Sequence, residues 1–140
     1  MAKKIALVGH CGPDSSYLRM TVQRVGKDVK VVSADDDREL SRVLAEGVDL
    51  VLFNRELGYG FTHAMGVDAI RHLRAMSPGL KMMLVSNYAD AQAAAVAAGA
   101  LPGFGKREIG SPRVLEVLQA ALAAEKTSPA VPEAGVQARS

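Results

Sequence analysis

The sequence has no tryptophan, a single cysteine, and aromatic residues that make up only 4% of its 140 positions. One cysteine cannot form a disulfide within the chain, so we expect a reducing compartment, the cytoplasm, and no covalent cross-link. The fold must therefore be held by a hydrophobic core. A length typical of one domain and a hydrophobic content of 49% are sufficient for such a core.

Long apolar runs and a strong charge are also missing. No run approaches the roughly 18 residues that a membrane-spanning helix needs. The apolar stretch Ile5–Val8 stops at Gly9, too early for a signal peptide. Lysine and arginine number 17 against 15 acidic residues, and they are scattered along the chain. We therefore expect neither a membrane nor a nucleic acid as partner.

Short apolar runs alternate with segments of helical period, which indicates β-α units on a parallel sheet and an α/β fold. The predicted strands are 5–8, 29–32, 49–53, 80–85 and a weaker 101–104. The predicted helices start at the N-cap Asp14, at the acidic run 35–37, after the glycine-rich loop 55–66, at Ala89 and at Pro112. Residues 1–124 are predicted to form the domain. The polar, proline-containing residues 125–140 are predicted to be a disordered tail.

Right-handed crossovers place the carboxyl ends of all strands on one edge of such a sheet. The loops after the strands, around residues 9–13, 54–66, 86–87 and 105–110, should therefore converge there. Asn54 closes the run Asp49–Asn54, whose four central residues are apolar, so that strand should lie buried at the sheet centre with its last side chain at the carboxyl edge. An amide at this position cannot act as a nucleophile toward phosphorus.

Several segments together resemble the receiver domain of response regulators. They are Val48–Asn54, Gly66–Arg74, Met83–Ser86, Ala98–Ala100 and Lys106. The resemblance extends over roughly residues 4–122. It implies a single flavodoxin-like, doubly wound, five-stranded parallel sheet with strand order 2-1-3-4-5.

The positions that carry receiver chemistry are only partly retained. Asn54 stands where the family has its acceptor aspartate, and Gly9 and His10 stand where it has an acidic pair for Mg²⁺. Ser86 and Lys106 match the family's hydroxyl and lysine. The residue after the lysine is Arg107 instead of proline, and the aromatic switch position is Gly103. The loop after the third strand is also longer than is common in the family.

The joint loss of nucleophile and metal carboxylates predicts a degenerate receiver, or pseudo-receiver, that is not an enzyme and needs no metal or cofactor. We expect a stand-alone signalling module, in a pathway of two-component type, that binds another signalling protein. The fourth helix, fifth strand and fifth helix are the expected contact face, and a homodimer is an alternative. Direct transcriptional control is not expected.

Cys11 carries the main alternative. The run Cys11–Ser16 lies between a strand and a helix amino terminus, where the thiol pKa falls and anions bind. It resembles the phosphocysteine loop of sugar-phosphotransferase IIB domains, which would imply a phosphotransfer or redox protein. An inert cysteine is the simpler interpretation. Asn54 likewise either hydrogen-bonds the neighbouring loop or senses a ligand, and Lys106 either binds an anion or pairs with Glu56 or Asp14.

Overall fold

The computed structural model describes residues 3–10 and 12–123, and in this range the predicted alternation of strands and helices is present. The strands are β1 (Lys3–Val8), β2 (Val29–Ala34), β3 (Leu50–Asn54), β4 (Met82–Val85) and β5 (Leu101–Phe104). The helices are α1 (Gly12–Gln23), α2 (Asp37–Glu46), α3 (Gly66–Met76), α4 (Ala89–Ala97) and α5 (Pro112–Ala123), with a 3-10 turn, η1, at Lys106–Glu108. The domain boundary at 124 and the tail 125–140 lie outside the described residues.

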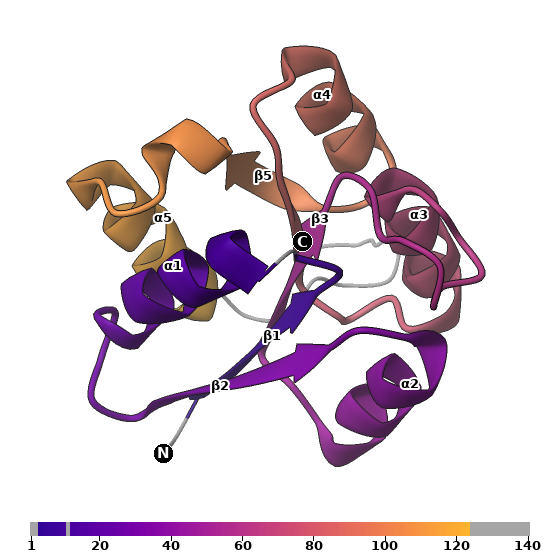
Figure 1. Cartoon of the computed structure of the whole chain (residues 1–140), viewed down its shortest axis with the longest axis horizontal. Coiled ribbons are helices and arrows are strands. Elements are labelled where there is room, and N and C mark those ends of the chain that lie inside the picture. Colours follow the sequence, from indigo (N-terminus) through magenta and orange to yellow (C-terminus); the bar gives the residue numbers. More distant parts are fainter. Residues whose placement is uncertain (1–2, 11, 124–140) are drawn as a thin grey trace, which may run out of the picture.

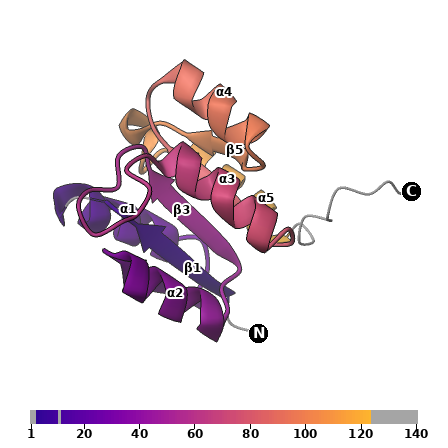
Figure 2. The same ribbon diagram turned by 90° about the vertical axis from the view of Figure 1, so that its right-hand side faces the viewer.

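The five strands form one parallel sheet in the order β2-β1-β3-β4-β5. This is the flavodoxin-like order that the resemblance implied. Helices α1 and α5 cover one face, and α2, α3 and α4 cover the other (Figures 1 and 2). β3 is central, and its four apolar residues, Leu50, Val51, Leu52 and Phe53, are completely buried. The prediction of a buried central strand is confirmed.

Alternate residues of β1, β2, β3 and β4 point into two separate cores, as the two-residue period of a strand requires. Val51 and Phe53 of β3 pack toward α2 and α3, whereas Leu50 and Leu52 pack toward α1 and α5. Each fully buried large side chain is worth about 1.5–3 kcal/mol. Both faces therefore need continuous apolar strands, which is why these runs do not alternate with polar residues.

Several predicted boundaries are wrong by one or two residues, since β1 begins at Lys3, β2 ends at Ala34 and β3 spans Leu50–Asn54. Helix α1 begins at Gly12, so Asp14 lies in its first turn and is not its N-cap. β4 begins at Met82 because Leu80 belongs to a turn, in which its N–H donates to the Ser77 carbonyl. The N-cap prediction for α2 is confirmed, since the Asp36 carboxylate accepts from the Glu39 N–H.

The long loop between β3 and α3 is folded onto the domain. Leu57 and Phe61 are buried in the core beneath it, and the Asp37 carboxylate accepts two hydrogen bonds from Thr62. Tyr59 stands fully exposed at its tip. In the part of the chain that the structure describes, no helix is both long and apolar enough to cross a membrane.

Candidate functional site

The carboxyl ends of β3 and β4 border a small polar cavity of about 270 Å³. It is lined by Asn54, Arg55, Glu56, Ser86, Asn87, Tyr88 and Lys106. The convergence of loops expected from the strand order therefore brings together Asn54, Ser86 and Lys106, three of the predicted site residues. Gly9 joins them through its carbonyl group, 3.2 Å from Asn54 Nδ2.

The Asn54 side chain is held by two backbone carbonyl groups. Its Nδ2 donates to the Gly9 carbonyl at 3.2 Å and to the Glu56 carbonyl at 2.8 Å. An NH₂ group can serve two acceptors, whereas an ionised carboxylate can only accept. The surrounding loops therefore favour an amide at position 54 over the aspartate of the receiver pattern. Asn54 Oδ1 is buried and has no hydrogen-bond partner among the described residues.

Gly9 leaves no room for the first carboxylate of an acidic pair. Its φ of +75° lies in the left-handed region, and a Cβ atom would stand 2.7 Å from Leu57 Cδ2 and 3.1 Å from Leu57 Cα. Residues other than glycine rarely adopt this backbone conformation. The long β3–α3 loop thus fills the space beside β1 with an apolar residue.

The His10 side chain points into the domain, away from the sheet edge where the family binds its metal ion. It is 9% exposed, and its Nε2 donates to the Leu52 carbonyl at 2.9 Å. Nδ1 is buried without a hydrogen-bond partner in residues 3–10 and 12–123. Burial lowers the pKa of the His10 imidazole, and the nearby Lys106 cation lowers it further, against the raising effect of the Leu52 carbonyl, Asp14 and Asp35. The ring is therefore neutral at pH 7.

The charges around the cavity are matched in pairs. Lys106 Nζ lies 3.0 Å from an Asp14 carboxylate oxygen, and Arg55 lies 3.2 Å from Glu56. The Arg55 guanidinium also stacks over the Tyr88 ring at 4.6 Å from its centroid. Of the alternatives for Lys106, the structure shows the ion pair with Asp14.

These donors do not fit Mg²⁺, which prefers octahedral coordination by hard oxygens, usually with carboxylates. Gly9 brings no side chain, His10 faces the interior, and the nearest carboxylates are engaged by Arg55 and Lys106. No group of three or more His, Cys, Asp or Glu side chains suited to a metal occurs in the described ranges.

At the position of the family's aromatic switch, no side chain fits. A Cβ atom on Gly103 would stand 2.1 Å from the Leu84 carbonyl oxygen and 3.0 Å from Gln92 Oε1. A bulge shifts the pairing here, with Met83 opposite Leu101 but Val85 opposite Phe104. The neighbouring Phe104 is 2% exposed and belongs to the core under α1 and α5.

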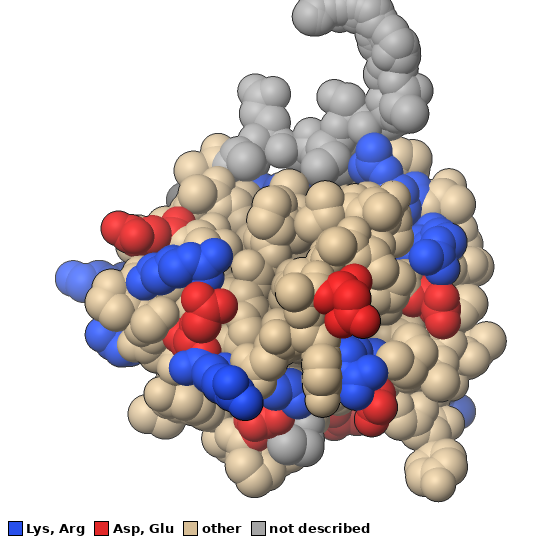
Figure 3. Space-filling view, turned by 90° about the horizontal axis from the view of Figure 1, so that it is seen from above, with Lys and Arg blue, Asp and Glu red and all other residues tan. Residues whose placement is uncertain are grey.

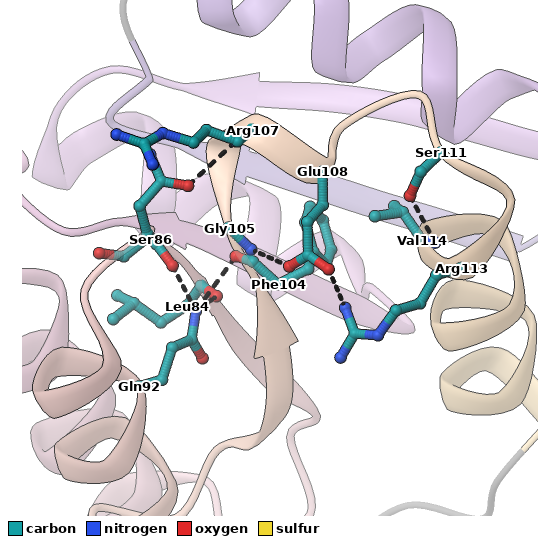
Figure 4. A network of polar contacts seen from close by, with 11 residues as sticks. Leu84, Ser86, Gln92, Phe104, Gly105, Arg107, Glu108, Ser111, Arg113 and Val114 are labelled. Atoms are coloured by element: carbon teal, nitrogen blue, oxygen red, sulfur yellow. Dashed lines mark hydrogen bonds and ion pairs between the residues drawn. The ribbon is translucent and has the colours of Figure 1, made fainter.

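The space between α4 and the ends of β4 and β5 is bordered by Leu84, Ser86, Gly103 and Phe104, and is called the floor beneath α4. The Gln92 side chain of α4 lies in it (Figure 4). Its Nε2 lies 2.9 Å from the Leu84 carbonyl oxygen and 3.1 Å from those of Ser86 and Phe104. The Ser86 side chain is 4% exposed, and its Oγ accepts from the Tyr88 N–H at 3.2 Å. The hydroxyl therefore serves the local turn, while the backbone of Ser86 is tied to α4 and β5.

The turn between β5 and α5 explains the departure at Arg107. The Arg107 N–H donates to Asn87 Oδ1 at 3.0 Å, and a proline has no N–H to offer there. Glu108 closes the turn by accepting from the Gly105 N–H at 2.8 Å and from Arg113 at 2.5 Å (Figure 4). The sequence after Lys106 is thus adapted to a different turn.

A groove of about 750 Å³ lies between α4, β5 and this turn. Ala89, Ala93 and Val96 of α4 form one wall, and Arg107 and Arg113 lie on the other. Viewed from above, uncharged surface in the middle of the molecule is interrupted by separate acidic and basic side chains (Figure 3). The groove lies on the α4–β5–α5 face, which the sequence predicts to bind a partner.

Comparison with solved structures identifies the architecture. The signal receiver domain of a DNA-binding response regulator from Colwellia psychrerythraea 34H matches with a TM-score of 0.70 and 13% identity, over 87% of this chain and 99% of that one. The chain has the receiver fold. The N-terminal receiver domain of a two-component response regulator from Bacteroides fragilis matches with a TM-score of 0.67 and 23% identity, over 89% of this chain and 99% of that one.

The receiver fold also occurs as part of longer proteins. NtrX from Brucella abortus matches with a TM-score of 0.73 and 17% identity over 87% of this chain, which spans 28% of that protein. No protein-family model matches the sequence, and no curated protein resembles it significantly. The similarity therefore lies in the fold. The chemistry has to be argued from the residues of this chain.

Of the predicted site residues, Cys11 lies outside the described residues, so the thiol hypothesis stays a prediction. Two residues that shape the receiver site were missed from the sequence, Leu57 and Gln92. Gln92 is the one uncharged polar residue in the alanine-rich α4, and that contrast was the available signal. Leu57 gave none, because the path of a long loop does not follow from periodicity.

Proposed function

We propose that the chain is an atypical receiver-like signalling module that acts by binding another protein, without aspartyl phosphorylation and without enzymatic activity of its own. The observation that supports this most strongly is the hydrogen bonding of Asn54. Its amide donates to two backbone carbonyl groups, so a residue that cannot accept a phosphoryl group is built into the loop structure. The proposal includes a cytoplasmic location, supported by the single cysteine.

The surroundings of Asn54 support the same proposal. A phosphoryl-transfer site needs a nucleophile and cations that are free to neutralise developing negative charge. Here Lys106 is paired with Asp14, Arg55 is paired with Glu56, and Leu57 covers Gly9. Restoring phosphorylation would require several of these contacts to break together.

The α4–β5–α5 face is the proposed contact surface. Val96, 45% exposed, and the exposed Ala89 and Ala93 present apolar surface beside the groove. Arg107 on the opposite wall has no ion pair or side-chain hydrogen bond among the described residues. Interfaces commonly combine an apolar centre with arginine at the edge. The partner would be another protein of a two-component-type pathway or a second copy of this chain.

Phosphorylation is tested by incubating the full chain with acetyl phosphate and Mg²⁺ and measuring its intact mass. We expect no acid-labile phosphoryl adduct, because Asn54 cannot form an acyl phosphate. An adduct mapped to a carboxylate of the site would overturn the proposal. An adduct mapped to Cys11 would instead favour the thiol-based alternative.

The contact face is tested by co-purification from the native cell of the wild type and of two single variants, Val96→Asp and Ala75→Asp. Both positions are exposed helix positions, but Ala75 lies on α3, outside the groove. We expect Val96→Asp to lose its specific partner and Ala75→Asp to keep it, with both variants folded by circular dichroism. Retention by both variants would place the interface elsewhere.

A further inference from the structure

We propose that Gln92 is a positioning residue that fixes α4 and β5 in one arrangement, so that the α4–β5–α5 face keeps its shape independently of the Ser86 hydroxyl and of Lys106. The role in docking rests on the proposed function, but the fixed arrangement itself does not. One carboxamide, that of Gln92, contacts three carbonyl groups (Figure 4). Gly103 beside it has no space for a side chain.

The Gln92 NH₂ group contacts three backbone carbonyl groups in two segments of the sheet. It contacts the carbonyl oxygens of Leu84 and Ser86 at the end of β4, and that of Phe104 at the end of β5. Two hydrogens are shared among three acceptors, so at least one contact is bifurcated. Because α4 otherwise offers mainly alanine to the sheet, this amide is its main polar attachment.

The backbone of Ser86 is held on both sides. Its N–H donates to the Phe104 carbonyl at 3.0 Å, and its own carbonyl oxygen lies 3.1 Å from Gln92 Nε2. The Phe104 carbonyl therefore accepts from both Ser86 and Gln92. A change at the Ser86 hydroxyl should therefore not move the Ser86 backbone, because these two hydrogen bonds hold it.

At the position of the family's aromatic switch, Gly103, there is no ring to carry a signal from the site to the face. Gly103 has no space for a side chain, since a Cβ atom would collide with the Leu84 carbonyl oxygen and crowd Gln92 Oε1. Phe104 is packed into the opposite core with Val85 and Val114. The space next to β5 is occupied by the Gln92 carboxamide, whose Nε2 contacts three carbonyl oxygens.

Amide hydrogen exchange of the full chain tests this directly. Gln92→Met keeps the side-chain volume and removes the donor, so we expect the protection of the Ser86 N–H to fall about tenfold or more, as a loss of local stability would produce. Gln119→Met is the matched control, because Gln119 Nε2 also reaches a backbone carbonyl, that of Val25, on the α1–α5 side. It should leave Ser86 unchanged.

Ser86→Ala separates positioning by Gln92 from signalling by the hydroxyl. We expect protection of the β5 amides to stay within about twofold of the wild type, well below the tenfold change that corresponds to 1.4 kcal/mol. The proposal is overturned if Gln92→Met leaves exchange unchanged. It is also overturned if Ser86→Ala loosens β5 as much as Gln92→Met does.

Gln92→Glu supplies a second readout if the methionine variant does not fold. Three carbonyl oxygens favour a protonated acid over a carboxylate, so NMR titration should find the pKa of the new carboxyl group raised above that of an ordinary glutamate. An ordinary pKa would mean that the side chain at 92 does not lie among these carbonyl groups. Neither experiment uses a partner, so a failed docking test leaves this inference standing, and the reverse also holds.

Discussion

The cavity around Asn54 and the floor beneath α4 are both polar, and both include Ser86, yet they use their amides in opposite ways. Gln92 contacts three carbonyl groups with its NH₂ and lies where a mobile side chain would have to move. Asn54 satisfies two carbonyl groups but leaves its own oxygen buried and without a partner among the described residues, as is His10 Nδ1. Beneath α4 the donor group of Gln92 has all its acceptors, whereas the cavity keeps a buried acceptor without a donor.

This difference indicates how a switchable fold can become a static one. In the cavity, the cations that could respond to a phosphoryl group are engaged by carboxylates, in the Lys106–Asp14 and Arg55–Glu56 pairs. Beneath α4, the route by which a response could reach the surface is closed by Gln92 and by the lack of space at Gly103. The two changes are independent. Restoring one should not restore the other.

The largest effect is expected from placing an aromatic ring at position 103. Gly103→Tyr would put a Cβ atom 2.1 Å from the Leu84 carbonyl oxygen. Because backbone would have to move, we expect a loss of about 3 kcal/mol or more in the free energy of unfolding, measured by urea denaturation. Gly12→Ala is the control, since nothing lies within 4 Å of a Cβ atom there. A stable Gly103→Tyr protein would show that the floor is not closed.

Restoring the acceptor carboxylate should cost less. In Asn54→Asp, two carbonyl groups lose their donor and face an anion, so we expect a loss of about 2–3 kcal/mol at pH 7. The loss should shrink at acid pH as the carboxyl group gains a proton that it can donate.

Asn87→Asp is the matched control for that substitution, because Asn87 uses its oxygen, as acceptor for the Arg107 N–H. A carboxylate keeps that function, so the stability should change by no more than about 0.5 kcal/mol. Equal losses in both variants would contradict the assignment of the Asn54 amide as a donor.

His10 should make stability fall toward acid pH. Its pKa is lowered in the folded protein, so the unfolded chain binds more protons as pH drops below the ordinary value of about 6.5. The stabilisation is therefore complete above that pH and is lost as pH falls toward the lowered pKa, with a slope of at most about 1.4 kcal/mol per pH unit for one proton. Comparing urea denaturation of the wild type and His10→Gln from pH 7.5 to about 5 tests this. The variant should show a flatter profile, and parallel profiles would exclude His10 as the source.

The smallest effect is expected at Lys106, the lysine that matches the receiver pattern. Lys106 is 35% exposed at its side chain and pairs with Asp14, which is 34% exposed. A pair this accessible is worth about 1 kcal/mol or less. Lys106→Ala should therefore change the free energy of unfolding only slightly and leave the spectra of α4 and β5 intact. A large loss would mean that the lysine still organises the site.

The sequence was sufficient for much of this architecture, because buried parallel strands are continuous apolar runs and their order followed from the receiver resemblance. It also placed Asn54 at a strand end, as the structure has it. For Lys106 it left an anion, Glu56 and Asp14 as alternatives, and the structure shows the pair with Asp14. The contacts of Gln92 and of Gly9 could not be predicted from the sequence. An alanine-rich helix has no apolar stripe to show which side faces the sheet, so Gln92 could not be assigned to the floor.

Gly9 illustrates a second limit. Its presence at an acidic-pair position was visible, but its left-handed backbone and its contact with Leu57 depend on how a long loop returns to the sheet. Such contacts are long-range and carry no periodic signal in the sequence. The helix start at Gly12 was missed for a related reason. Asp14 is a favourable N-cap residue, but in the structure it lies in the first turn of α1 and its carboxylate pairs with the distant Lys106.

The central claim is that phosphoryl donors at the cavity do not change the α4–β5–α5 face. The most direct measurement is the ¹H–¹⁵N spectrum of the full chain before and after addition of Mg²⁺ with acetyl phosphate. We predict that the amide resonances of Ala89–Ala97 and Leu101–Phe104 stay at their positions, since Asn54 accepts no phosphoryl group and Gln92 holds the floor. Saturable shifts of these resonances that reverse when the donor is exhausted would contradict the account.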